Sequence, residues 1–298
     1  MTKFAMFLLL LLPSTLVTSA QQPARSPGQL KQIIPGHYVY SSIVGGRFFN
    51  SGVVATSEGV LVFDALESEA TGRAEREAIS SIIKQPVRLL VSSTFHDNYS
   101  KGNLAYSDVF KIGHENYRAG FIEQLQRGGV SVEEQRARLP NQTFRDRVTL
   151  YLGGKEIQVL YLGSGHTRGD SVVFVPQDRI AYLSELFFAE EFPNSAQGYG
   201  ASWLRVLDQI EALPADIFVP GHGAIPENPR DTRAQLHRMR QIFVDARDAL
   251  QDQIARAATE DQAAAVVKLQ QYEKLPTYTE QRETFVRRMY KEMTGKLP

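Results

Sequence analysis

Short apolar runs separated by turn residues dominate the chain from about residue 33 onward. Runs of this length, rich in Val, Ile, Leu and Phe and bounded by Gly, Pro or acidic residues, are typical of buried strands rather than of helices. The pattern predicts strands at 37–40, 52–56, 60–64, 87–91, 157–161, 171–175, 180–183 and 217–219. These segments indicate a sheet that runs through most of the chain.

Helical spacing of apolar residues appears between these strands and after the last of them. Residues 68–84 predict a helix with Ala70, Ala74, Ala78 and Ile82 on its core face, and 203–213 predict a second one. Beyond residue 228 the chain predicts only helices with long polar faces, at 232–257, 260–272 and 280–294. We therefore expect an α/β domain over 33–225 and a C-terminal helical extension over 226–298, preceded by a flexible lead-in at 21–32.

The N-terminal residues differ from the rest of the chain. Lys3 precedes an apolar run over 4–12, and small residues follow at 18–20. This pattern predicts a signal peptide over 1–20, cut after Ala20, and so a periplasmic or secreted protein without a membrane segment after cleavage. The alternative is a membrane anchor, although the apolar run is too short to span a bilayer.

Composition narrows the class of partner and the source of stability. Lys and Arg number 33, as do Asp and Glu, so no net positive charge points to nucleic acid, and we expect a small-molecule substrate or ligand. The chain has no cysteine, so an exported protein of this sequence depends on its core rather than on disulfides.

Three of the six histidines follow predicted strands directly, namely His96, His166 and His222, and Glu185 has the same kind of position. Strand ends converge at one edge of an α/β sheet, and imidazole and carboxylate groups suit zinc. A single loop histidine more often makes ordinary hydrogen bonds, but the repetition favours a metal site. The other three, interpreted as structural or surface residues, are His37, His114 and His237.

The motifs "GHTRGD" (165–170) and "PGHG" (220–223), in this order, resemble those of the metallo-β-lactamase superfamily. The stretch "NSGVVATSEGVLVFDA" (50–65) is similar to the opening hairpin and acid-ended strand of that family. The resemblance covers about 33–225. It implies a four-layer αβ/βα sandwich and a metal-dependent hydrolase that cleaves an ester, thioester or amide.

The loop "SSTFHDNYSKGN" (92–103) departs from the family pattern T-H-x-H-x-D-H. With the closing Gly-Asn fixing the register, the pattern's positions fall on Thr94, His96, Asn98 and Tyr99. The resemblance further places the later ligands at His166, Glu185 and His222. Because neutral hydroxyl and amide groups bind transition metals weakly, the sequence predicts one zinc ion on His96, His166, Glu185 and His222, or no metal at all.

Two functional hypotheses follow for this altered site. In the first, the protein is a hydrolase with a mononuclear site, in which Asn98 replaces the family's loop acid and Glu185 is a ligand or a base. Asn98 forms hydrogen bonds but cannot accept a proton. In the second, the protein is a non-catalytic descendant that binds a small molecule or a protein. The C-terminal helices are expected to pack against the domain, to form a homodimer, or to cap the pocket.

Overall fold

The computed structural model describes residues 25–297, so the signal peptide predicted at 1–20 lies outside the described residues. Twelve strands of the described part form one hydrogen-bonded network. They are β1 (Arg25–Ile34), β2 (His37–Val44), β3 (Arg47–Ala55), β4 (Val60–Phe63), β5 (Val87–Ser92), β6 (Phe110–His114), β7 (Gln142–Phe144), β8 (Arg147–Leu152), β9 (Lys155–Leu160), β10 (Val172–Val175), β11 (Ile180–Phe188) and β12 (Ile217–His222).

The strand network has two halves that meet at a single pairing. The order is β7-β6-β5-β4-β3-β12-β11-β10-β9-β8, and β2 and β1 continue from β3. β3 contacts β12 through the pair Phe49 and His222. Because β12 ends at His222, the junction of the two halves places this predicted ligand at the centre of the molecule.

The helices lie before, between and after the strands. They are α1 (Glu69–Ile82), α2 (Asp97–Ser100), α3 (Glu115–Arg127), α4 (Val132–Arg138), α5 (Gly200–Glu211), α6 (Thr232–Ala255), α7 (Glu260–Val266) and α8 (Tyr278–Met293), with the 3-10 turns η1 (Lys101–Tyr106), η2 (Pro176–Asp178), η3 (Pro229–Asp231) and η4 (Gln270–Tyr272). None of the helices within 25–297 combines the length and the apolar composition that crossing a bilayer requires.

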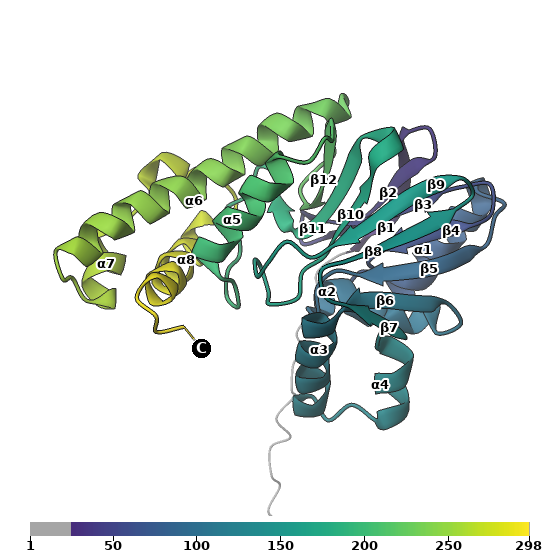
Figure 1. Cartoon of the computed structure of the whole chain (residues 1–298), viewed down its shortest axis with the longest axis horizontal. Helices are drawn as coiled ribbons and strands as arrows, with labels where there is room; N and C mark the ends of the chain where they lie inside the picture. Colours follow the sequence, from purple (N-terminus) through teal and green to yellow (C-terminus); the bar gives the residue numbers. More distant parts are fainter. Residues whose placement is uncertain (1–24, 298) are drawn as a thin grey trace, which may run out of the picture.

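Apolar side chains fill three layers of core. The inner one joins the two halves of the sheet, with Phe63 and Val91 on one side and Tyr182 on the other. One outer core joins α1 and η1 to β3–β5, and the other joins α5, α6 and α8 to β10–β12. Figure 1 shows α5, α6, α7 and α8 gathered on one side of the strands. This is the predicted four-layer αβ/βα sandwich with a C-terminal helical extension.

The predicted core face of α1 is wrong. The helix buries Gly72, Glu75 and Ile79, whereas Ile82 is 58% exposed. The reason is the close approach of α1 to η1, because a Cβ on Gly72 would lie 2.8 Å from the carbonyl oxygen of Gly102. Glu75 is buried on the same face because the hydroxyls of Ser51 and Tyr106 donate hydrogen bonds to the oxygens of its carboxyl group.

Two further boundaries need correction. From Arg25 onward the predicted lead-in is strand β1, which pairs antiparallel with β2. The Gln, Pro and Ser residues of this segment do not indicate a strand. Backbone pairing with β2 and the partial burial of Leu30 stabilise it instead. The helix predicted at 260–272 ends at Val266, and η4 follows.

Candidate metal centre

Four residues that are far apart in the sequence converge at the junction of the two sheet halves. His96 Nδ1 lies 2.8 Å from Glu185 Oε2, and His166 Nε2 lies 2.9 Å from His96 Nδ1 and 3.1 Å from Glu185 Oε2. His222 Nε2 lies 3.3 Å from the other oxygen, Glu185 Oε1. Within 25–297, His96, His166 and Glu185 form the one group of potential metal ligands with converging atoms. We call these three residues the ligand cluster.

Glu185 reaches the cluster from within a strand. The sequence pattern predicted a strand that ends at residue 183, but β11 continues to Phe188, so Glu185 is part of it. The preceding residue, Ser184, has a left-handed backbone with φ 49°, and β11 pairs irregularly with β12 here. This irregularity is a β-bulge of the kind that re-aims a side chain beside a functional site.

The acid-ended strand β4 anchors the loop that carries His96. Asp64 accepts hydrogen bonds from Ser93 N at 2.8 Å and Ser93 Oγ at 2.6 Å, and from Ser184 Oγ at 2.6 Å. Asp64 thereby ties β4 to the residues beside both His96 and Glu185. Burial raises the pKa of Asp64 to about 7.

Glycine is required where the loop closes. The N–H of Gly102 donates to Leu66 O at 3.0 Å, and a Cβ at this position would lie 1.7 Å from the carbonyl oxygen of Ala65. In "PGHG", a Cβ on Gly221 would lie 2.3 Å from the carbonyl carbon of Ser184. Both motif glycines therefore permit a backbone approach that the site needs and that no larger residue allows.

Hydrogen bonds outside the cluster orient its two imidazoles. His166 Nδ1 lies 3.0 Å from the carbonyl oxygen of Asn194, which only accepts, so Nδ1 carries a proton. His96 Nε2 lies 3.2 Å from Gln197 Oε1, which makes Nε2 the donor. The free nitrogens, His96 Nδ1 and His166 Nε2, then point at each other and at Glu185. Such outer partners fix the tautomer of metal-binding histidines.

The cluster therefore requires one positive charge at its centre. Two nitrogen lone pairs and a carboxylate oxygen at 2.8–3.1 Å repel one another unless a proton or a metal ion lies between them. Ligand atoms around a four-coordinate zinc ion are roughly 3.3 Å apart. The residues thus fit a zinc ion after an expansion of a few tenths of an ångström.

The pKa shifts in the cluster agree with this view. Burial lowers the pKa of His96, but the carboxylate of Glu185 outweighs burial and raises the pKa to about 9. Burial raises the pKa of Glu185, but His166 and His96 outweigh it and hold that pKa well below its usual range. Without metal, a proton on His96 supplies the central charge.

The departure at Tyr99 closes part of the second metal subsite that the family resemblance implies, whereas Thr94 falls on a ligand position of the first subsite. The Tyr99 side chain is fully buried and its hydroxyl donates a hydrogen bond to Gly221 O at 2.5 Å. Burial raises the pKa of this phenol well above its usual value, so it stays neutral. Thr94 is buried, and its hydroxyl has no hydrogen-bond partner within 25–297. Asn98 is exposed on α2, the short helix that His96 precedes.

His222 lies in an aromatic cage. Its ring stacks on Phe188 at 4.3 Å between centroids, with Phe49 at 4.9 Å and Tyr99 at 5.6 Å in edge contacts. Burial lowers the pKa of His222, so the ring is neutral, and its Nδ1 has no partner among the described residues. His222 Nε2 is then the group that donates to Glu185 Oε1.

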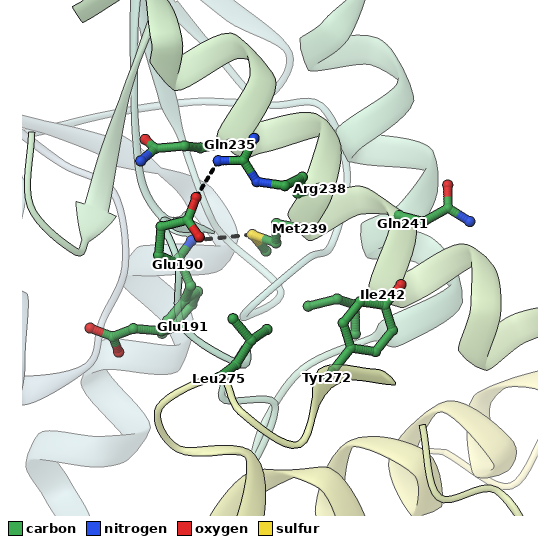
Figure 2. Close-up of a pocket in the computed structure, with 10 residues that line it drawn as sticks. Glu190, Glu191, Gln235, Arg238, Met239, Gln241, Ile242, Tyr272 and Leu275 are labelled. Atoms are coloured by element: carbon green, nitrogen blue, oxygen red, sulfur yellow. Dashed lines mark hydrogen bonds and ion pairs between the residues drawn. The ribbon is translucent and has the colours of Figure 1, made fainter. Parts of the chain in front are cut away.

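Phe188 also lines an apolar cavity of about 200 Å³ between the end of β11, α6 and η4 (Figure 2). Figure 2 shows Met239, Ile242 and Leu275 around the cavity, with Glu190 turned toward Arg238. Both acidic groups here are already paired, Glu190 with Arg238 and Glu191 with Arg47. The cavity thus lies next to Phe188, the ring that stacks on His222, but its lining offers no set of metal ligands.

The remaining histidines are structural or surface residues, as interpreted from the sequence. Buried His37 contacts Asp178 at 2.7 Å. His114 accepts a hydrogen bond from Asn116 N and so caps α3. His237, on α6, is exposed and contacts Glu211 at 3.0 Å. None of them approaches the ligand cluster.

Sequence reasoning missed the loop at 189–199 and the support it receives. This loop carries Asn194 and Gln197, the outer partners of His166 and His96. The C-terminal extension holds it in place at several points, which are Phe192 N to Pro276 O at 2.9 Å, Thr277 Oγ1 to Phe192 O at 2.7 Å and Arg288 Nε to Gly198 O at 2.9 Å. A backbone carbonyl that orients a histidine leaves no signal in the sequence.

Comparison with known proteins identifies a family and relatives of this chain. The family model described as the metallo-beta-lactamase superfamily matches residues 44–222. A linear primary-alkylsulfatase from Pseudomonas sp. is 24% identical over 265 residues, covering 73% of this chain and 49% of its own length. This chain thus spans about half the length of that relative.

Two solved structures share the fold. A metallo-beta-lactamase from Pontibacter korlensis is 22% identical with a TM-score of 0.60, covering 72% of this chain and 99% of its own. The sec-alkylsulfatase Pisa1 from Pseudomonas sp. is 15% identical with a TM-score of 0.66, covering 90% of this chain and 50% of its own. Because residues 226–298 are about a quarter of this chain, the second match includes helices of the extension.

Proposed function

This chain belongs to the metallo-β-lactamase superfamily, and on that premise we propose that it is a hydrolase with a single metal ion on His96, His166 and Glu185. The observation that carries the proposal is the convergence of three acceptor atoms within 2.8–3.1 Å, with outer hydrogen bonds that leave both imidazole lone pairs facing inward. Three protein ligands and one open position are the usual arrangement of a catalytic zinc site.

Zinc bound at this cluster would supply a Lewis acid and lower the pKa of a coordinated water toward neutrality. Glu185 serves as a ligand rather than as the base, because a carboxylate whose pKa lies well below its usual range is a poor proton acceptor at neutral pH. His222 orients Glu185 through the 3.3 Å contact to Oε1. Asn98 is exposed on α2 and takes no proton, so its proposed role is to hydrogen-bond a substrate or water and not to act as a base.

The substrate class we propose is a small molecule with an ester, thioester or amide bond. The second hypothesis is a non-catalytic binding protein. It draws support from Tyr99, which occupies the place of a family ligand and is committed to Gly221 O. The two hypotheses differ in one measurable property, because only the hydrolase requires the cluster to hold a metal.

Metal analysis of the purified protein tests the proposal. We expect about one equivalent of zinc after equilibration, lost in His166→Ala and retained in His237→Ala, which removes an exposed histidine on α6. The zinc-loaded protein should hydrolyse a 4-nitrophenyl ester faster than either metal-free protein or His166→Ala. A folded protein that takes up no zinc would remove the hydrolase and leave the binding protein.

A further inference from the structure

A polar cavity of about 340 Å³ is lined by Phe95, the residue before His96, and by residues of α3, α8 and the loop at 189–199. Its wall includes Gln197, whose Oε1 accepts from His96 Nε2. His96 is also the cluster member with the largest exposed fraction, 19% against 0% for His166 and 3% for Glu185. Among the three side chains of the cluster, solvent therefore reaches that of His96 most readily. The lining residues are Phe95, Gly120, Glu123, Arg127, Arg168, Gln197, Tyr199 and Arg288.

The lining carries an excess of positive charge. Three arginines face one carboxylate, Glu123, which pairs with Arg168 at 2.6 Å. Arg127, in the last turn of α3, and Arg288, on α8, form no ion pair with any residue in 25–297. Neither guanidinium is held in an ion pair, although Glu292, one turn further along α8, interacts electrostatically with Arg288.

Arg288 is the most constrained of the three. Its Nε donates to Gly198 O at 2.9 Å, and its guanidinium lies over the ring of Tyr199, 5.9 Å from the centroid. These contacts hold the plane of the group and use one of its five N–H donors. The side chain is partly buried, and burial lowers its pKa more than Tyr199 and Glu292 raise it. A fixed, unpaired guanidinium fork is suited to bind a planar or tetrahedral oxyanion through two N–H groups.

We propose that this cavity is the anion subsite of the active site, in which Arg288, assisted by Arg127 and Arg168, binds an oxyanion group of the substrate. The group is a sulfate, phosphate or carboxylate, and the bond to be cleaved lies toward His96. The inference rests on the proposed function. It gives the C-terminal extension a specific role, because α8 supplies the arginine that selects the substrate.

Calorimetric titration of metal-free His166→Ala with inorganic sulfate, phosphate and acetate, at constant ionic strength, tests the subsite without any metal. We expect saturable binding of at least one anion, weakened about 10- to 100-fold by adding Arg288→Ala, the range for losing a charge-assisted hydrogen bond. Arg288→Lys should recover part of the affinity. The matched control is Arg287→Ala on the same helix, whose guanidinium pairs with Asp261 and Glu283, and it should leave anion binding unchanged.

Kinetics of the zinc-loaded protein separate this inference from the proposed function. With 4-nitrophenyl sulfate or phosphate, Arg288→Ala should raise KM more than it lowers kcat, and more than it raises KM for neutral 4-nitrophenyl acetate. Anion binding without hydrolysis of any ester would support the subsite and refute the hydrolase. Ester hydrolysis without an effect of Arg288→Ala on anionic substrates, or anion titrations that are flat or equal in both arginine variants, would refute the subsite.

Discussion

Removal of Glu292 should both destabilise the fold and weaken the metal site. Glu292, near the end of α8, accepts hydrogen bonds from Ala201 N at 2.8 Å and Ser202 N at 2.9 Å, and also from Ser202 Oγ. These groups lie in the first turn of α5, and the residue at the N-cap position of α5, Tyr199, makes no side-chain capping hydrogen bond. A carboxylate from another helix thus serves as the N-terminal cap of α5 and favours its dipole.

The size of the effect follows from these contacts. Loss of a helix cap costs about 0.5–2 kcal/mol, and loss of a negative charge at a helix N-terminus costs about 0.3–1 kcal/mol. Glu292→Ala should therefore lower the free energy of unfolding by about 1–3 kcal/mol. At an unfolding entropy of about 0.6 kcal/mol/K for a chain of this length, the melting temperature falls by roughly 2–5 °C.

The same change should reach the ligand cluster through the loop at 189–199. Gln197 orients His96 and lies just before α5, so a frayed α5 loosens this hydrogen bond. Loss of outer partners typically costs about 10–100-fold in metal affinity, and loosening them should cost part of that range. We expect zinc to bind several-fold more weakly to Glu292→Ala, as measured by competition with a chromophoric chelator.

Glu283→Ala is the matched control for this experiment. Glu283 lies on the same helix, is exposed and pairs with Arg287 four residues later, so its removal should leave the melting temperature almost unchanged. Equal melting temperatures for the two variants would show that the cap of α5 is unimportant. A destabilised Glu292→Ala with unchanged zinc affinity would refute the coupling between α8 and the ligand cluster.

Three further predictions concern protons and the altered loop. Because the pKa of His96 is raised to about 9, zinc must displace a proton from this residue below that pH. The apparent dissociation constant for zinc should therefore fall about tenfold for each unit that the pH rises between 6 and 8. A dissociation constant that does not change with pH would contradict this. Burial raises the pKa of Glu75 from 4.5 to about 8, so the folded chain keeps a proton that the unfolded chain releases, and stability should fall as pH rises through that window. Glu75→Gln should flatten this decline in urea denaturation, and parallel curves would exclude Glu75 as its cause. Thr94→His, Asn98→Asp and Tyr99→His together should raise zinc content from about one to two equivalents per chain, measured with correctly folded protein; no increase would mean that other residues close the second subsite.

The sequence predicted eight of the twelve strands and the ligand-bearing loops, because these depend on local signals, and it missed β1, β6, β7 and β8. The apolar run 87–91 located β5 to within one residue, the run 217–219 located the start of β12 but not its end at His222, and "GHTRGD" is a loop in which Thr167 donates to Asp170 at 2.6 Å. The β-bulge at Ser184 and Glu185 was not predictable, since nothing in a strand-like run indicates where its pairing becomes irregular. The predicted ligand role of His222 stays a prediction.

What the sequence could not give are features made by distant segments. The core face of α1 was misjudged because glycine and glutamate are not expected in a core. Gly72 is buried because it permits close contact with Gly102, and Glu75 is buried because two hydroxyls donate hydrogen bonds to it. The role of the C-terminal extension was equally hidden. Arg288 lies 122 positions after His166, and only the fold brings both to the borders of one loop.

The surroundings of His222 support the proposal of one cation at this site over two. A second ion would need ligands where Tyr99 is held by Gly221 O, and it would have to lie beside the rings of Phe49, Tyr99 and Phe188. Charge is costly in such a low-dielectric cage unless paired groups offset it, and His222 is the one neutral donor available there. The single carboxylate, Glu185, already balances the charge at the ligand cluster. The departure at Tyr99, which removes a ligand from the second subsite, therefore also removes solvation that a second ion would require.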